Sequence, residues 1–398
     1  MKELLYLAHR IPYPPNKGDK VRSYNEVKYL AKNYKVHLAA FIDDPNDWQY
    51  VNELKKLCGE TFFIGLNSKW ARLKSARGLL TGEALTLPYY RNSQLSDWVK
   101  QLLVSQPVKH VLIYSSPMAQ YVPNEASLRK IADFVDVDSD KWRQYSSTKL
   151  WPLSWIYGRE ANKLSTFERK IASQFDATLL VAPHETELLR QIATESISKI
   201  HCVKNGVDAE FFSPEHQFSN PYHENELPVV FTGAMDYWPN IDAVEWFAHN
   251  VYPKVKEVEP RATFYIVGAR PAASLDKLKV IKGITVTGSV ADVRPYIAHA
   301  ALSVAPLRIA RGVQNKVLEA MAMAKAVVVS DQAASGIDAE NGKEFLVAKT
   351  NGENFATAVC KVLHTEEKQA IGKAARQKVL KDYSWDANLA CLDTLLSK

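Results

Sequence analysis

Short apolar segments alternate with longer segments of helical spacing along the whole chain, and this alternation constrains the fold more than any other feature. Each apolar segment has the length of a strand, and the stretch between two of them is long enough for a helical crossover. The order therefore predicts an α/β fold in which helices cover parallel sheets. The predicted strands are Glu3–Leu7, Lys35–Phe41, Glu60–Ile64, His110–Ile113, Lys130–Asp136 and Ala177–Ala182 in the first half, and Leu227–Thr232, Thr263–Val267, Ile284–Thr287, Leu302–Ala305, Ala326–Ser330 and Glu344–Val347 in the second half.

The length of the chain indicates more than one domain. At 398 residues it exceeds the size at which a single hydrophobic core stops growing. The segment between Phe212 and Pro228 is rich in Ser, Asn, Pro and His and lacks periodicity, so it is the natural linker. We expect one domain at residues 1–212, a second at residues 213–380, and a last amphipathic helix within residues 381–398.

Composition and missing motifs exclude several classes of protein. No apolar run reaches the length of a transmembrane helix, and the apolar core at the N-terminus is too short for a secretory signal, so we expect a cytoplasmic protein. Four cysteines without a C-x-x-C spacing argue against a zinc site or a disulfide framework. The absence of G-x-G-x-x-G, G-x-x-x-x-G-K-[ST], H-E-x-x-H and G-x-S-x-G disfavours a dehydrogenase, a P-loop NTPase, a zinc protease and a serine hydrolase.

The segment from Arg308 to Glu319 has the features of an anion site. A helix that starts near Gly312 presents unpaired N–H groups and the positive end of its dipole beyond the preceding strand. Arg308, Arg311 and Lys316 add positive charge around the same point. Glu319 falls about two turns into this helix and can share a face with Lys316. A nucleotide diphosphate with its ribose suits this pattern, although many α/β proteins place a helix after a buried strand for packing alone.

Three further segments carry a resemblance to a known family. They are Asn205–Pro214, with the sequence NGVDAEFFSP, the strand and turn Phe231–Asn240, and the strand and turn Phe264–Gly268. Together with the segment at 308–330, they resemble the retaining glycosyltransferases of family 4, also called glycosyl transferases group 1. The resemblance covers essentially the whole chain. It is closest to the sugar transferases associated with exosortase (PEP-CTERM) and exopolysaccharide loci of Gram-negative bacteria.

The resemblance implies a fold and an activity. The fold is the GT-B architecture, in which two Rossmann-like, doubly wound domains face a cleft and the C-terminal helix crosses back to the first domain. The activity is that of a hexosyltransferase, which moves a sugar from a nucleotide-diphosphate sugar to a hydroxyl acceptor with retention of configuration. A lipid-linked exopolysaccharide intermediate is the implied acceptor. No cofactor besides the donor is expected, and no metal, because the helix dipole and cations take the place of the metal in this fold.

Donor and catalytic roles follow from the same resemblance. Glu319 would hold the ribose, the helix start would hold the diphosphate, and Asp138, Lys316 and Glu319 would form the catalytic set. The predicted donor-binding residues are Gly233, Asn240, Arg270, Arg308, Arg311, Gly312, Val313, Asn315, Lys316 and Glu319.

The chain departs from the family pattern at two places. Family members usually carry two glutamates eight residues apart on this element, and the first position here is Arg311. Many members also place an arginine and a lysine after the strand glycine, where this chain has Ala234 and Met235. We therefore expect the positive charge to come from Arg311 and Lys316, with Arg308 or Arg270 in reserve.

The first domain is expected to bind the acceptor. Its opening turn, Pro12–Arg22, follows the first strand, and ligands of such sheets lie beyond the carboxyl ends of the strands. Gly18 permits a close approach of the backbone, and Asp19, Lys20 and Arg22 complete the predicted acceptor site. An ordinary strand-to-helix connection, in which Pro and Gly serve only as breakers, would have the same sequence.

Several polar and aromatic residues follow in the first domain. Asp138, in the run DVDSD, is expected to face the cleft on the acceptor side. The aromatic stretch from Trp142 to Tyr157 could stack on sugar rings or touch lipid, although core packing is the more common role of such residues. Glu160 and Glu168 are interpreted as solvated or structural residues. His9 and His184 follow strands, where active-site histidines could lie, but lone histidines are more often structural than catalytic.

Positive charge is concentrated in the first part of the chain. Residues 1–204 contain 29 Lys and Arg against 21 Asp and Glu, or +8, while residues 205–398 contain 21 against 23, or −2. Within the first part, Lys69–Leu80 intersperses four cations with Trp and Leu, so it could lie on an anionic inner-membrane surface. A solvated surface helix would have the same pattern. Nucleic-acid binding is not supported, because no recognised module is present.

Two other interpretations of the sequence remain. A nucleotide-sugar epimerase or a phosphorylase could use the same fold. A non-catalytic, nucleotide-binding subunit of a polysaccharide assembly is the alternative from another class, and the arginine at the first glutamate position favours it.

Overall fold

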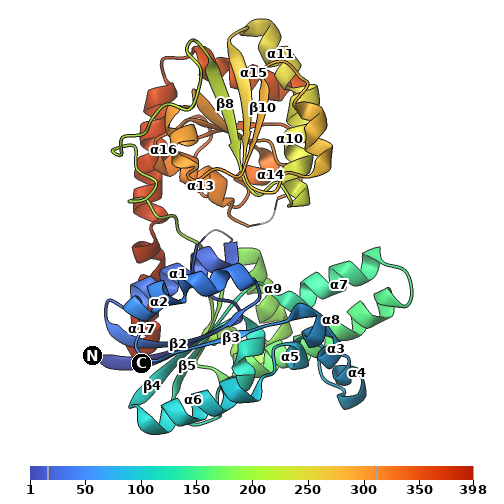
Figure 1. Ribbon diagram of the computed structural model, residues 1–398, viewed down its shortest axis with the longest axis vertical. Helices are drawn as coiled ribbons and strands as arrows, with labels where there is room; N and C mark the ends of the chain where they lie inside the picture. The colour runs from blue at the N-terminus through green and yellow to red at the C-terminus, as the bar shows by residue number, and fades with distance from the viewer. Residues whose placement is uncertain (16–17, 311, 398) are drawn as a thin grey trace. The chain divides into compact units, whose positions relative to one another are not determined.

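The computed structural model describes residues 1–15, 18–310 and 312–397. The chain forms two compact units (Figure 1). Unit 1 contains Met1–Lys204 together with Asn388–Lys398, and unit 2 contains Asn205–Ala387. Each unit is described separately below.

The described residues of unit 1 form a seven-stranded sheet in the order β3-β2-β1-β4-β5-β6-β7, with all neighbouring strands parallel. The central strands are apolar along almost their whole length, as expected for strands that are covered on both faces. The strands are β1 (Lys2–Ala8), β2 (Tyr34–Ile42), β3 (Thr61–Gly65), β4 (Val108–Tyr114), β5 (Arg129–Val135), β6 (Ala177–Leu180) and β7 (Ile200–Cys202).

Helices cover this sheet and bury its apolar side chains in one core, to which Leu5, Val111 and Ala132 contribute from three strands. Local capping sets some of the boundaries; α6, for example, begins where the Asn92 side chain accepts a hydrogen bond from Leu95 N–H. The α-helices are α1 (Gly18–Leu30), α2 (Val51–Leu57), α3 (Ser68–Ser75), α4 (Arg77–Thr81), α5 (Thr86–Tyr89), α6 (Ser93–Ser105), α7 (Asp138–Thr148), α8 (Leu153–Gln174) and α9 (Pro183–Ile192). The 3-10 helices are η1 (Pro45–Tyr50), η2 (Ser116–Tyr121) and η3 (Thr194–Lys199).

The described residues of unit 2 form a six-stranded parallel sheet in the order β10-β9-β8-β11-β12-β13. Val229, Phe264 and Val328 are fully buried on three of its strands and belong to one continuous core. The strands are β8 (Leu227–Thr232), β9 (Ala262–Val267), β10 (Ile284–Gly288), β11 (Leu302–Ala305), β12 (Val327–Ser330) and β13 (Leu346–Ala348). The helices are α10 (Trp238–Asn250), α11 (Tyr252–Val258), η4 (Ala273–Leu278), α12 (Arg294–His299), α13 (Asn315–Ala322), α14 (Asp331–Ala334), α15 (Gly352–His364) and α16 (Lys368–Asp382).

The C-terminal helix, α17 (Trp385–Ser397), begins in unit 2 and belongs to unit 1 from Asn388 onward. At its start, Val207 N–H donates a 2.8 Å hydrogen bond to the carbonyl oxygen of Tyr383. Further along, the carboxylate of Asp393 accepts a 2.6 Å hydrogen bond from the Tyr29 hydroxyl of α1. The last helix is thus anchored at both of its ends.

The strand order confirms the predicted fold of two doubly wound, Rossmann-like α/β domains. In each sheet the order reverses once, between β1 and β4 in unit 1 and between β8 and β11 in unit 2. Ligands of such sheets bind beyond the carboxyl ends of the strands at this point of reversal. The turns after these four strands are therefore the places to look for function. None of the helices in the described part of the chain combines the length and apolarity that a bilayer span requires.

Candidate functional site

In unit 2, two glycines bring the turns after neighbouring strands together. Gly233 follows β8 and Gly268 follows β9. A Cβ atom on Gly268 would lie 1.7 Å from the carbonyl oxygen of Gly233, so no other residue fits there without moving the backbone. A Cβ atom on Gly233 would lie 2.8 Å from Asn240 Nδ2 and 3.3 Å from Lys316 Cε. The Gly233 turn is therefore in contact with both of these side chains.

A chain of hydrogen bonds joins this turn to α10 and α13. Lys316 Nζ, from α13, donates a 2.8 Å hydrogen bond to Asn240 Oδ1 of α10. Asn240 is 4% exposed, and its Nδ2 donates a 2.9 Å hydrogen bond to the carbonyl oxygen of Ala234. The structure thus brings together three of the predicted donor residues, Gly233, Asn240 and Lys316, at the reversal of strand order.

Lys316 and Glu319 are half-buried on α13 and influence each other's titration. Desolvation lowers the pKa of Lys316 to about 8, against the opposing effect of the Glu319 carboxylate. Desolvation also raises the pKa of Glu319 to about 7, against the opposing effect of the Lys316 ammonium. The Lys316 ammonium lies 5.1 Å from the centre of the Phe231 ring. An anionic ligand would favour the charged form of Lys316, and a ligand hydroxyl could donate to the carboxylate of Glu319.

The helix that carries these residues starts later than predicted. α13 begins at Asn315 and not near Gly312, because Gly312 has a left-handed backbone (φ 61°) and Gln314 is extended. Glu319 therefore lies one turn into the helix and not two. Gln314 offers no side-chain cap to α13, and Asn315 Oδ1 is buried without a hydrogen-bond partner among the described residues. Val313 packs partly against the core of unit 2.

The two reserve arginines are engaged with carboxylates that the sequence analysis did not identify. Arg308 Nε donates a 2.9 Å hydrogen bond to Asp242 of α10. Arg270, which has a positive φ of 55°, lies 3.0 Å from a carboxylate oxygen of Asp236. Each arginine would have to exchange its partner before it could bind a phosphate. Arg311 lies outside the described residues.

In unit 1, Gly18 and Asp19 begin α1 beside the end of β1. A Cβ atom on Gly18 would meet no atom of the described residues within 4 Å. The carboxylate of Asp19 pairs with Arg10 and lies 3.8 Å from His9 Nε2. Both residues are at the turn where a ligand of this sheet is expected.

Lys20 and Arg22 have a different role from the one predicted. Lys20 is 2% exposed and pairs with Asp47 at 2.6 Å. Arg22 is fully buried, and its guanidinium contacts Asp133 at 2.5 Å and Glu26 at 3.2 Å. These cations compensate buried carboxylates inside unit 1. The prediction that they meet an acceptor diphosphate does not fit this position, because α1 turns that face inward.

Asp138 begins α7 at the carboxyl edge of the same sheet. Lys141 bridges the carboxylates of Asp136, at 2.8 Å, and Asp138, at 3.1 Å, and both carboxylates raise the pKa of this lysine. Val135, just before them, has a φ of 69°, which is strained for a β-branched residue. Strain of this kind is concentrated at functional sites. No cluster of three metal-ligating side chains occurs within the described residues.

Glu168 of α8 fixes the start of α7, and it is structural, one of the two roles that the sequence left open. It accepts hydrogen bonds from Ser139 N–H at 3.1 Å and from the Ser139 hydroxyl at 2.5 Å. Desolvation, followed by the charge of Asp138, raises the pKa of Glu168 to about 8. Glu168 is thus a positioning residue for Asp138. Its signal in the sequence is its spacing from Glu160, since both lie on the buried face of one helix.

His9 was interpreted from the sequence as a structural histidine at a position where an active-site histidine could lie. Its ring stacks on Tyr114, with centres 5.7 Å apart, and meets Tyr90 edge-on. Burial lowers the pKa of His9, and its Nδ1 has no hydrogen-bond partner among the described residues. His9 follows β1 and Tyr114 ends β4, so both lie at the reversal of strand order in unit 1.

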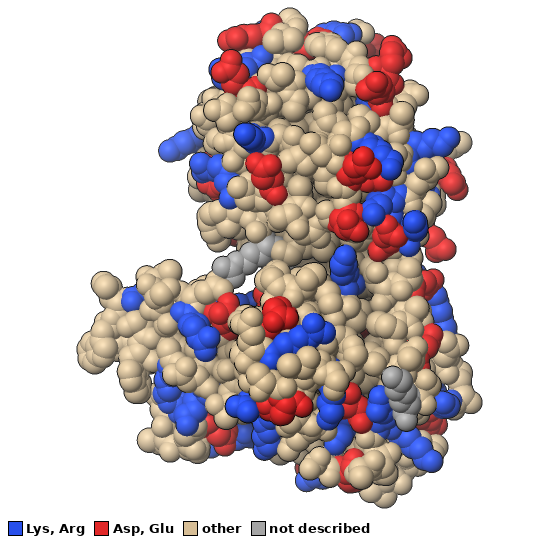
Figure 2. All heavy atoms as spheres, turned by 180° about the vertical axis from the view of Figure 1, so that it is seen from behind, with Lys and Arg blue, Asp and Glu red and all other residues tan. Residues whose placement is uncertain are grey.

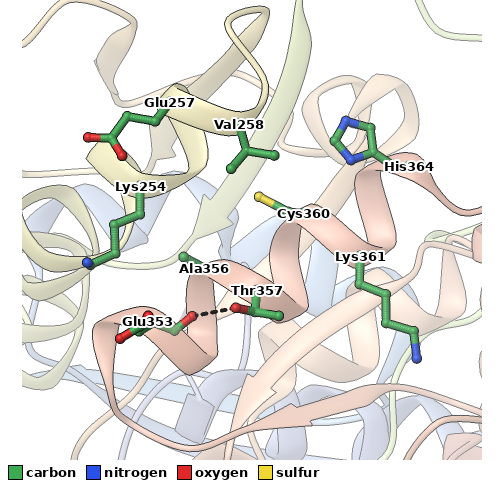
Figure 3. Close-up of a pocket in the computed structure, with 9 residues that line it drawn as sticks. All are labelled: Lys254, Glu257, Val258, Glu353, Ala356, Thr357, Cys360, Lys361 and His364. Atoms are coloured by element: carbon green, nitrogen blue, oxygen red, sulfur yellow. Dashed lines mark hydrogen bonds between the residues drawn. The ribbon is translucent and has the colours of Figure 1, made fainter.

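A surface hollow between α11 and α15 involves none of these residues (Figure 3). Figure 3 shows Val258 on α11 facing Cys360 on α15. Burial raises the pKa of Cys360, so its thiol is not an activated nucleophile. The hollow therefore offers no evident chemistry.

One comparison with known protein families matches a part of unit 2. Residues 226–365 match the family of glycosyl transferases group 1. A comparison with curated protein sequences gave no match.

Solved structures of similar fold cover the whole chain. Sucrose-phosphate synthase from Thermosynechococcus elongatus is 14% identical over 99% of this chain and 98% of its own, with a TM-score of 0.69. HepE of Anabaena, solved with UDP, is 13% identical over the full length of both chains, with a TM-score of 0.67. WaaG, a glycosyltransferase of lipopolysaccharide biosynthesis, is 14% identical over 99% of this chain and 100% of its own, with a TM-score of 0.66. The solved structures therefore show that the chain has the GT-B architecture of two Rossmann-like domains, and part of unit 2 matches the model of glycosyl transferases group 1.

Proposed function

We propose that the protein is a glycosyltransferase that moves a sugar from a nucleotide-diphosphate sugar to a hydroxyl acceptor with retention of configuration. The observation that carries the proposal is the contact of Lys316 with Asn240 and the Gly233 turn, one helical turn from Glu319. It places a cation and a carboxylate of raised pKa where sheets of this topology bind nucleotides.

Each donor residue has a proposed role. Lys316 stabilises the charge of the diphosphate, backbone N–H groups at the start of α13 bind its oxygens, and Glu319 accepts hydrogen bonds from the ribose. Arg311 is proposed to add charge at the same point. HepE and TarM were both solved with UDP. We therefore propose a uridine nucleotide as the donor of this chain.

In the proposed reaction, the protein mainly positions the donor and the acceptor, and it contributes little acid–base chemistry of its own. In the retaining mechanism that the family resemblance implies, the departing diphosphate takes up the acceptor proton. The protein then contributes orientation and stabilisation of charge on the leaving group. We propose that Asp138 orients the acceptor hydroxyl, with Gly18 and Asp19 on the same side.

The acceptor is proposed to be a lipid-linked exopolysaccharide intermediate at the cytoplasmic face of the inner membrane. The positive balance of residues 1–204 favours an anionic acceptor or an anionic surface next to it. WaaG, which has a similar fold, is a glycosyltransferase involved in lipopolysaccharide biosynthesis.

A second candidate is a non-catalytic, nucleotide-binding subunit of a polysaccharide assembly. The observation that favours it is the arginine at position 311, where the family has its first glutamate. An epimerase or a phosphorylase on the same fold is the remaining alternative.

One experiment separates these candidates. Thermal shift and donor hydrolysis are measured with UDP-, GDP-, ADP- and dTDP-sugars on the wild type, on Glu319→Ala and on Glu366→Ala, a matched change at an exposed glutamate of unit 2. The proposal of a glycosyltransferase is supported if one nucleotide sugar stabilises the protein and is slowly hydrolysed, and if only Glu319→Ala loses both effects. Stabilisation without turnover, even with lipid-linked acceptors, supports the non-catalytic subunit. Equal behaviour of all three proteins contradicts the assignment of Glu319.

A further inference from the structure

Two segments of unit 1 are free of carboxylates. Residues 61–82 and residues 141–159 contain no Asp or Glu, although these make up 44 of the 398 residues of the chain. Each segment contains four Lys or Arg. The first segment includes α3 and α4, and the second runs from α7 into α8. Both segments therefore carry only positive charge.

The same two segments expose large apolar side chains. They contribute nine of the twenty exposed large hydrophobic residues among those that the structure describes. Leu80 is 91% exposed, Leu150 is 88% exposed and Trp151 is 81% exposed. Core packing therefore does not account for the outer part of the aromatic stretch, and contact with sugar or lipid remains for it. The nine residues are Trp70, Leu73, Leu79, Leu80, Tyr145, Leu150, Trp151, Leu153 and Trp155.

Buried polar contacts hold the two segments together. Arg159 of α8 donates hydrogen bonds to the carbonyl oxygens of Gly78, at 2.6 Å, and Glu83, at 3.0 Å. Glu160, which is 1% exposed, accepts hydrogen bonds from the N–H groups of Leu85 and Thr86. These contacts tie α4 and α5 to α8.

The arrangement is visible as a projection of unit 1. Figure 1 shows the pair α7 and α8 extending away from the sheet, with α3 and α4 next to α8. Figure 2 shows the projecting part of unit 1, at the lower left, as mostly apolar or neutral with blue side chains among the tan. Exposed apolar patches of this kind mark binding surfaces in proteins.

We propose that these two segments form one surface that docks on an anionic lipid bilayer. Tryptophan, tyrosine and leucine enter the boundary between headgroups and acyl chains, while lysine and arginine meet the anionic headgroups. A nucleic acid would use the cations but would leave Leu80 and Leu150 in water. The absence of carboxylates matters because one carboxylate at a bilayer surface repels the same headgroups that the cations attract.

The surface deepens the proposed function, since it would hold the enzyme where a lipid-linked acceptor is found. α7 begins at Asp138, a proposed acceptor residue, and leads to the exposed tip around Trp151. Its eleven residues span roughly 16 Å. An acceptor headgroup would need to project about that far from the bilayer to reach Asp138. Docking itself does not depend on catalysis and can be tested alone.

Co-sedimentation with vesicles tests the proposal on the full chain. Vesicles of equal parts phosphatidylglycerol and phosphatidylcholine are compared with vesicles of phosphatidylcholine alone. The wild type should sediment with the anionic vesicles only. The double variant Trp151→Ser, Trp155→Ser should have a partition coefficient onto the anionic vesicles that is lower by at least about ten-fold. Lys74→Gln with Arg77→Gln should lower it about 25-fold at low salt, since each cation contributes about five-fold.

Matched controls lie elsewhere on unit 1. Val104→Ser changes a side chain that is 90% exposed on α6, and Lys55→Gln changes an exposed lysine on α2. Both should sediment like the wild type. Thermal shift by the donor nucleotide should be the same in every variant, because unit 2 is unchanged. Loss of donor binding with intact docking would overturn the proposed function and leave the surface standing.

Three results would overturn the proposed surface. The first is a wild-type protein that does not sediment with anionic vesicles. The second is equal sedimentation of the tip variants and their controls. The third is self-association in light scattering that the tip variants abolish while no form of the protein binds vesicles, which would make the surface a contact between copies of this chain.

Discussion

The ammonium of Lys316 lies 2.8 Å from the side-chain oxygen of Asn240, and this contact ties α13 to the turn after β8. In the glycosyltransferases that the sequence resembles, cations often come from that turn itself, where this chain has Ala234 and Met235. Here a cation reaches the turn from the neighbouring helix. The finding supports the hypothesis that positive charge has moved from the Gly233 turn to α13.

Replacement of Lys316 by methionine should weaken donor binding. A charge-assisted hydrogen bond contributes about 1.5–3 kcal/mol, so we expect a loss of roughly ten-fold to 100-fold in affinity for the donor nucleotide. Isothermal titration calorimetry with UDP measures it, and Lys277→Met, at an exposed lysine of unit 2, is the control. An affinity within two-fold of the wild type in both variants would show that Lys316 does not meet the diphosphate.

The same lysine predicts how donor affinity depends on pH. The pKa of Lys316 is lowered to about 8, and only the protonated form attracts a diphosphate. Affinity should therefore fall as pH rises from 7 to 9, well below the range in which an exposed lysine titrates. Binding of UDP is measured at several pH values in one buffer of constant ionic strength. A flat profile over this range would contradict the role of Lys316, as would the same fall in Lys316→Met.

Glu319 makes a separate prediction about stability. Its pKa in the folded protein is raised to about 7, above the value of an unfolded glutamate, so its contribution to stability is complete at low pH and is lost as pH rises towards 7. The free energy of unfolding of unit 2 should fall by up to about 2 kcal/mol between pH 5 and 7. Glu319→Gln should remove this fall. Urea unfolding at each pH measures the free energy of unfolding. If this free energy depends on pH in the same way in the wild type and in Glu319→Gln, the predicted contribution of Glu319 is excluded.

Much of the fold could be predicted because the strands are apolar and of regular length. Leu302–Ala305 and Leu227–Thr232 were predicted at their observed bounds. The strand Ile200–Cys202 was missed, because three residues at a sheet edge carry no periodic signal. The start of α13 was placed too early, since the left-handed Gly312 was interpreted as a helix start and not as part of the turn before it.

The site was harder to predict than the fold, because its charged side chains pair with residues that are far away in the sequence. Arg22 pairs with Asp133, which lies 111 residues further along the chain. Arg308 pairs with Asp242, which lies 66 residues before it. A single sequence shows each cation but not the carboxylate that the fold brings to it. The proximity of Gly233, Asn240 and Lys316 could be predicted, because each follows a strand whose end is at the reversal of strand order. At that point the topology determines the neighbours of a residue.

The glycine contact below the donor site should be intolerant of change. In Gly268→Ala, the new methyl group would occupy the position 1.7 Å from Gly233 O, so β8 and β9 must separate at their ends. We expect a loss of about 3 kcal/mol or more in the stability of unit 2 and loss of donor binding. Gly158→Ala is the control, since its methyl group would meet only Ser146 Cβ at 3.9 Å. Wild-type donor affinity in Gly268→Ala would show that the turn is not part of the site.

The last prediction concerns the buried charges of unit 1. Arg22 compensates Asp133 and Glu26 in the interior, so Arg22→Met should leave both carboxylates without their cation and destabilise unit 1 by about 3–5 kcal/mol. If Arg22 instead met an acceptor diphosphate, the variant would keep its stability and lose acceptor affinity. Urea unfolding followed by the fluorescence of the tryptophans reports on stability, and UDP affinity reports that unit 2 is intact. Arg22→Met with Asp133→Asn should recover part of the lost stability, because it removes one of the uncompensated charges, and a double variant less stable than the single one would contradict the pairing.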